Sequence, residues 1–259
     1  MMPIDVGQLE GWVGSACWAL ARISGLLLVA PVLGATMIPA RIRLGLALLL
    51  TMALGPLAPL DIRPLSAEGV ATLAQQVLVG ASLGFILKLI FEAVSFGGQL
   101  VSQAMSLGFA ETVNPGVGGT TPVLSQFYTM LVTLLFLVMN GHLQLIALLA
   151  DSFRSLPVSE QGIGTNGLWG VLEFASHLFG GAVRVALPAL TATLVVNLGF
   201  GAISRSAPSM NLFAVGFPIT ICLGLLAVWL ALRALPGAFD SLQTEAWDAM
   251  RQLVGRSSP

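Results

Sequence analysis

Six long apolar stretches follow one another along the chain, separated by short segments rich in polar residues, glycine or proline. They lie at residues 12–38, 41–60, 70–107, 123–150, 168–200 and 211–235. About 20 consecutive apolar residues are enough for a helix to cross the ~30 Å hydrocarbon core of a bilayer. The pattern therefore predicts an all-α integral membrane protein with about six long helices.

The stretch at residues 70–107 is too long for one straight span. Its 38 residues would extend roughly 57 Å as a helix, nearly twice the thickness of the hydrocarbon core. We therefore expect this helix to bend or to leave the bilayer, and Gly97-Gly98 is the predicted position of the kink. We expect the long apolar helices of this chain to be bent or broken.

The C-terminal segment after Pro236-Gly237 has a different pattern. Apolar residues recur there at helical spacing, namely Phe239, Leu242, Ala246, Ala249 or Met250, and Leu253. Charged residues lie on the other faces. This predicts an amphipathic helix and tail at 237–259, after a single membrane domain at 1–236. The helix either folds back on the protein, lies at the membrane surface or docks to a partner subunit.

Composition and charge support a membrane protein and exclude nucleic acid as a partner. The chain is 56% hydrophobic and 9% charged, with a net charge of -1 and no basic stripe. The segment MMPIDVGQLE carries two acids and no basic residue, so we expect no cleavable signal peptide. The basic residues outside the apolar stretches or at their ends, with Arg233 included, divide five against three between the two sides, which does not decide the orientation.

Two glycine motifs resemble those of enzymes but lie in the wrong context. Gly80-Ala-Ser-Leu-Gly84 matches G-x-S-x-G, yet it lies in a continuous apolar helix, where Gly80 and Gly84 predict close helix packing. Gly162-Ile-Gly164-Thr-Asn-Gly167 matches G-x-G-x-x-G without a preceding strand. Cys17 and Cys222 are isolated. We therefore expect no catalytic, cofactor-binding or metal-binding residues, and no cofactor.

Charged and polar residues inside the apolar stretches are candidates for buried polar or subunit contacts, because each charge costs about 2.5–3.5 kcal/mol at a bilayer centre on insertion scales. Lys88 and Glu92 have the spacing to neutralise each other on one helix face, and Glu173 and His177 share that spacing. Direct transport chemistry stays an alternative to structural pairing. The complete set of candidates is Arg22, Lys88, Glu92, Asn140, His142, Arg184, Arg205 and Asn211.

The loop GFAETVNPGVGGTTP, residues 108–122, interrupts the apolar pattern. Its fifteen residues include four glycines, three threonines and two prolines, with one acid and no base. Gly108 suits the end of one helix, and Thr121-Pro122 suits the start of the next. The loop exceeds the 2–8 residues usual between bundled helices, which predicts a functional insertion.

Three longer segments resemble the FliR family of flagellar type III export-gate components. They are ARISGLLLVAPVLGATMIPARIRLGLALLL, FLVMNGHLQLIALLADSFRSLP and LPALTATLVVNLGFGAISRSAPSMNLFAVGFPITICLGL. The resemblance runs in order from about Trp18 to Leu232. It implies helical hairpins packed into a hetero-oligomeric export gate with FliP-like and FliQ-like subunits and an attached FlhB-like subunit. It also implies membrane lipid as surroundings and unfolded flagellar proteins as the transported substrate.

The resemblance further implies that the loop is a channel plug in the inner (cytoplasmic) membrane, at the flagellar basal body. In this family Phe109, Ala110, Asn114, Pro115 and Gly116 match an FA...DPG-like run, with Asn114 in place of the usual aspartate. The implied plug residues are Gly108, Phe109, Ala110, Glu111, Asn114, Pro115, Gly116, Gly118, Gly119, Thr121 and Pro122. A virulence injectisome homologue and a self-contained secondary transporter are the alternatives.

Overall fold

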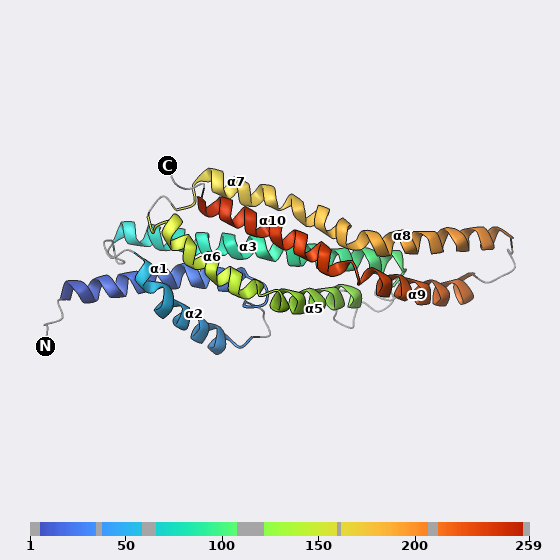
Figure 1. Ribbon diagram of the computed structural model, residues 1–259, viewed down its shortest axis with the longest axis horizontal. Coiled ribbons are helices and arrows are strands. Elements are labelled where there is room, and N and C mark those ends of the chain that lie inside the picture. Colours follow the sequence, from blue (N-terminus) through green and yellow to red (C-terminus); the bar gives the residue numbers. More distant parts are fainter. Residues whose placement is uncertain are drawn as a thin grey trace. The chain divides into compact units, whose positions relative to one another are not determined.

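A computed structural model of the chain describes residues 6–34, 38–58, 66–107, 122–159, 162–206 and 212–255. All regular elements in these ranges are helices, which confirms the predicted all-α class. Figure 1 shows them in chain order as α1 (Val6–Val29), α2 (Ala40–Leu54), the short 3-10 helix η1 (Gly55–Leu57), α3 (Ala67–Ala104), α5 (Val123–Val138), α6 (Gly141–Ser155), α7 (Thr165–Phe174), α8 (Ser176–Ser206), α9 (Leu212–Ala231) and α10 (Leu235–Gly255).

The helices agree with the predicted membrane spans in number and apolar character. Within the described ranges, four stretches are long and apolar enough to cross a membrane, or up to six if two bent helix pairs each count as one span. One bent pair joins α9 to α10 at an angle of 58°. The other break, between α5 and α6, occurs at Asn140, whose backbone is left-handed with φ 57°. Asparagine tolerates this conformation better than most residues, which explains the break there.

The chain divides into two compact units. Unit 1 comprises residues 1–89, 136–176 and 245–259, and unit 2 comprises residues 90–135 and 177–244. Unit 1 contains α1, α2, η1, α6 and α7, and unit 2 contains α9 and most of α5 and α8. Because α3 and α10 each contribute to both units, the division does not follow the predicted boundary near residue 236. The predicted division into one domain and a terminal helix stays a prediction.

In unit 1, glycines bring α1 and α3 into backbone contact. A Cβ atom added to Gly84 would lie 2.9 Å from both the Ala30 nitrogen and the Leu26 oxygen, and one added to Gly80 would lie 2.8 Å from the Leu26 nitrogen. Real Cβ atoms do not approach backbone atoms this closely, so only glycine permits the contact. This confirms Gly80 and Gly84 as a close-packing surface rather than a nucleophile elbow.

In unit 2, α3 continues through Gly97-Gly98 without an interruption. A Cβ atom at Gly97 would lie 2.9 Å from the Ala182 oxygen of α8, and one at Gly98 would lie 2.9 Å from the Ser125 Cα atom of α5. The two glycines therefore allow neighbouring helices to approach on two sides, a role that the sequence pattern did not suggest. Close packing is thus one reason for the two glycines, and the predicted kink stays a prediction.

The C-terminal helix α10 folds back on the protein. The predicted apolar face is buried, with Phe239, Ala246 and Met250 at 0% exposure and Leu242 at 1%. In unit 2 the Phe239 ring meets the Phe91 ring of α3 edge to face, with 5.7 Å between ring centroids. Of the alternatives drawn from the sequence, the structure favours a helix packed on its own chain.

Several helices leave broad apolar faces uncovered. Only 17% of the best apolar window in the α7–α8 stretch and 22% of that in α2 is buried, against 67% in α3. Exposed patches of this extent mark surfaces that lipid or other proteins cover. These faces are therefore candidates for contact with lipid or with other subunits.

Candidate functional site

Arg22, on α1 in unit 1, is a charged side chain with no exposure to solvent at all. Its Nε and Nη2 groups donate to the Gln76 Oε1 atom at 2.8 and 2.5 Å. Its Nη1 group donates to the Ser152 carbonyl oxygen at 2.7 Å and to the Ser152 Oγ atom at 3.0 Å. Nη2 also donates to the Leu156 carbonyl oxygen at 2.9 Å. These five bonds match the five N–H groups of a guanidinium, so every donor has an acceptor.

The acceptors around Arg22 are neutral, and no carboxylate is among them. Two of them are carbonyl oxygens at the C-terminal end of α6, where a helix carries a partial negative charge of about half an electron. The Phe153 ring lies under the guanidinium, 4.2 Å from Cζ to the ring centroid. Helix end, amide and ring together compensate the buried cation. We call Arg22, Gln76, Ser152, Phe153 and Leu156 the Arg22 cluster.

Local packing explains why Arg22 has this position. The backbone of Arg22 lies against Gly80, where any larger residue would collide with the Arg22 carbonyl oxygen. Close contact between α1 and α3 therefore places Arg22 beside Gln76, one turn away from Gly80 on α3. The Arg22 cluster thus joins α1, α3 and the end of α6. In chemical terms it fixes three helices and leaves no N–H group of Arg22 free for another ligand.

The partners of Arg22 were not anticipated from the sequence. Gln75-Gln76 stands out as an amide pair near the start of a long apolar stretch, and this was the available signal. Ser152 and the carbonyl of Leu156 carried no signal, because a backbone oxygen is present at every residue. The Gln76 Nε2 atom is buried and has no hydrogen-bond partner within the described ranges.

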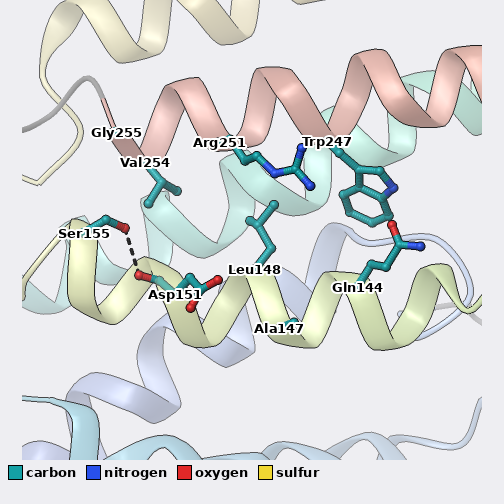
Figure 2. A pocket seen from close by; sticks show the side chains of 9 residues that line it. All are labelled: Gln144, Ala147, Leu148, Asp151, Ser155, Trp247, Arg251, Val254 and Gly255. Atoms are coloured by element: carbon teal, nitrogen blue, oxygen red, sulfur yellow. Dashed lines mark hydrogen bonds between the residues drawn. The ribbon is translucent and has the colours of Figure 1, made fainter.

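A groove of about 350 Å³ lies elsewhere in unit 1, between α6 and α10. Trp247 and Arg251 project from α10 towards α6, where Gln144, Leu148 and Asp151 form the facing side (Figure 2). Arg251 pairs with Asp248 of its own helix, with 3.1 Å between Nη1 and Oδ1. The polar groups around the groove belong to exposed residues apart from Trp247, which is 6% exposed. A shallow groove with opposite charges on its two sides contains no reactive constellation.

The other predicted polar residues in the described ranges are less buried than Arg22. Lys88, Glu92, Arg184 and Arg205 are exposed. His142 is partly buried, and its Nδ1 atom has no hydrogen-bond partner within the described residues. Exposed charges on otherwise apolar helices are compatible with contacts to other subunits, so this assignment stays a prediction.

Two predicted features lie outside the described residues. One is the plug loop, from Gly108 to Thr121, of which the described part begins with Pro122, a buried residue that precedes α5. The other is Asn211. Within the described ranges, no group of three or more His, Cys, Asp or Glu residues could hold a metal ion.

Comparison with known proteins gives a consistent match along almost the whole chain. The family described as "Bacterial export proteins, family 1" matches residues 13–246. The chain is 34% identical over 259 residues to the flagellar biosynthetic protein FliR of Pectobacterium carotovorum subsp. carotovorum, covering 100% of this chain and 99% of the relative.

Two further relatives carry the same description. The flagellar biosynthetic protein FliR of Escherichia coli (strain K12) is 34% identical over 256 residues, with 98% of both chains covered. That of Bacillus subtilis (strain 168) is 25% identical over 244 residues, with 90% of this chain and 92% of the relative covered. The similarity thus extends over both compact units.

Proposed function

Because the chain belongs to the FliR family of bacterial export proteins, we propose that it is a non-enzymatic subunit of the flagellar type III export gate. It is a membrane-embedded component of flagellar protein export. In the proposed role it helps to form and close the channel through which unfolded flagellar proteins cross the inner membrane. The full-length similarity to flagellar proteins supports this role over that of a virulence injectisome homologue.

The observation that carries the proposal is the uncovered apolar surface of α7 and α8. The apolar stretch at residues 165–203 has 39 residues, and 17% of its best window is buried. At about 1.5 Å per residue it extends roughly 58 Å, far beyond a ~30 Å hydrocarbon core. Lipid can cover only part of such a surface. The remainder requires apolar faces of other subunits.

FliP-like and FliQ-like subunits are the proposed partners on these faces, with a FlhB-like subunit attached to the assembly. Exposed apolar side chains on α8 include Phe179, Leu187 and Val195, at 64%, 52% and 69% exposure. Permanent interfaces between subunits are this apolar, and they resemble a protein core divided in two. Association through them stabilises each subunit.

The loop at residues 108–122 is the proposed channel closure. It connects the end of α3 to α5, and apart from Phe109 its residues have small or medium side chains, with one acid and no base. A plug must close a lumen and then yield to an unfolded chain, and such a composition suits that requirement. Asn114 leaves the proposed plug one negative charge short of the usual family pattern.

Co-expression tests the proposal against a self-contained transporter. Expressed with FliP-like and FliQ-like subunits, a tagged chain should co-purify with both in mild detergent, and its yield should rise severalfold over expression alone. The matched control is the same chain with Leu187 and Val195 replaced by serine, which should lose the subunits. A monodisperse and stable chain without any partner would contradict the export-gate role and support a transporter.

A further inference from the structure

One face of α2, in unit 1, carries a positive charge at one end of an exposed apolar stripe. Arg41, Gly45, Leu48 and Met52 lie within about 60° of arc around the helix, since each residue advances 100°. All four are exposed, with Leu48 at 48% and Met52 at 79%. Leu44 and Leu49 flank them at 60% and 67%. We call Arg41, Gly45, Leu48 and Met52 the α2 stripe.

The opposite face of α2 packs on its own unit. Its buried residues are Ala47, Thr51 and Leu54, and its neighbours there are α1 and η1. The α2 stripe therefore faces away from the helices that hold α2 in place. An exposed apolar stripe of this kind marks a surface that lipid or another protein covers.

Charge and shape identify the covering group. Arg41 forms no hydrogen bond or ion pair with the described part of the chain. Next along the stripe is Gly45, where an added Cβ atom would meet nothing within 4 Å, so the surface is open there. Beyond it come only the apolar side chains of Leu48 and Met52. The stripe thus has a cationic residue at one end, an open surface at the glycine and apolar side chains beyond it.

The length of the stripe matches one leaflet of a bilayer. Eleven residues separate Arg41 from Met52, a rise of roughly 16 Å, and half of a ~30 Å hydrocarbon core is about 15 Å. Side chains in a helix tilt towards its N-terminus, which directs Arg41 away from the apolar run. Its guanidinium then reaches the level of the lipid head groups when the run lies in the hydrocarbon.

We propose that the α2 stripe binds an anionic phospholipid, with the phosphate on Arg41 and an acyl chain along Gly45, Leu48 and Met52. Guanidinium groups bind phosphate oxygens through paired hydrogen bonds. This inference rests on the proposed function in so far as α2 must lie in a membrane. A second polypeptide fits less well, because one phospholipid molecule accounts both for the charge of Arg41, which is unpaired within the described residues, and for the apolar run.

Lipid binding to the purified complex tests the proposal. The chain, co-expressed with FliP-like and FliQ-like subunits, is delipidated in mild detergent and titrated with phosphatidylglycerol or phosphatidylcholine, and bound lipid is counted by native mass spectrometry. Wild type should bind phosphatidylglycerol more tightly, and Arg41→Gln should weaken that binding about fivefold, the effect of one basic residue at an anionic surface. Equal binding by wild type and Arg41→Gln would overturn the proposal.

Arg43→Gln is the matched control, because Arg43 lies about 200° from Arg41 around the same helix. It removes the same charge from the same turn and should retain phosphatidylglycerol binding. A loss as large as that of Arg41→Gln would mean general charge attraction and overturn the site. Gly45→Trp should weaken binding with Arg41 intact, because its indole covers the path of the acyl chain at a position where an added Cβ atom meets nothing within 4 Å.

Two further measurements distinguish a lipid phosphate from a free phosphate, and a bound lipid from a partner polypeptide. Glycerol phosphate, which has the head-group chemistry without acyl chains, should not compete at the lipid concentration, and full competition would overturn the lipid site. A photoreactive residue at Leu48 should cross-link to lipid, whereas cross-linking to a partner polypeptide would overturn it. Failure of the FliP-like and FliQ-like subunits to co-purify contradicts the proposed function instead, and is scored in the same preparation.

Discussion

Arg22 shows how a buried charge is accommodated without an acid. Its five N–H groups are distributed over the Gln76 amide, the Ser152 hydroxyl and carbonyl, and the Leu156 carbonyl. A single unpaired donor at such a depth costs about 1–3 kcal/mol, and more where the group is charged. The position of Arg22 in an apolar stretch could be predicted from the sequence as an unusual feature. Its partners could not, because two of the acceptors are backbone oxygens 130 and 134 residues away.

Removing the amide acceptor should destabilise the protein more than removing both partners. Gln76→Leu leaves two N–H groups of Arg22 without an acceptor, and we expect a loss of about 3 kcal/mol in the free energy of unfolding. The double variant Arg22→Met with Gln76→Leu removes the charge as well and should recover at least part of that loss. Thermal unfolding in mild detergent, followed by tryptophan fluorescence, measures both.

Arg154→Gln is the control for this comparison, because Arg154 is an exposed arginine at the same end of α6. It should change stability by no more than about 0.5 kcal/mol, as surface substitutions do. A double variant that is less stable than Gln76→Leu alone would show that the charge of Arg22 contributes stability by itself, contrary to our account.

At the scale of elements, periodicity predicted more than glycine positions did. The buried face of α10 was read correctly from Phe239, Leu242 and Met250, because an amphipathic helix that packs on its own chain displays its environment in its spacing. Gly97-Gly98 predicts a kink, and the structure adds that the two glycines allow α8 and α5 to approach α3. A glycine pair permits both outcomes, and only the neighbouring helices decide between them. Their identity depends on contacts between residues far apart in the sequence.

The glycine contact between α1 and α3 gives a prediction at this scale. Gly80→Ala should separate the two helices, because its Cβ atom collides with the backbone of Arg22 and Leu26 rather than with a side chain that could move. We expect a loss of about 1–3 kcal/mol, as for other overpacked contacts. Gly170→Ala on α7 is the control, since nothing lies within 4 Å of an added Cβ atom there. Equal stability of the two variants would contradict backbone contact between α1 and α3.

At the scale of the whole molecule, hydropathy could predict the membrane location but not how the surface is divided between lipid and protein. Lipid tails and apolar side chains of partner subunits select the same apolar residues, so hydropathy alone does not distinguish the surroundings of α2 from those of α8. The difference lies in length and in the position of charge. The exposed α2 stripe, from Arg41 to Met52, is about one leaflet long and has its charge at one end, whereas the α7–α8 stretch exceeds the bilayer. We therefore assign lipid to the first and subunits to the second.

Closure of the assembled channel is the property that we propose for the loop at residues 108–122. Deleting Gly116 to Thr121 shortens the loop by six residues and leaves both flanking helices intact, so the assembly should form with an unfilled lumen. We expect bacteria that express the deletion with FliP-like and FliQ-like subunits to become permeable to small ions, measured by conductance or by loss of membrane potential. Asn114→Asp restores the usual family residue without changing the length of the loop, and it should leave the channel closed. Unchanged ion permeability in cells where the deleted chain still co-purifies with its partners would contradict the plug, because the lumen would then be closed by another part of the assembly.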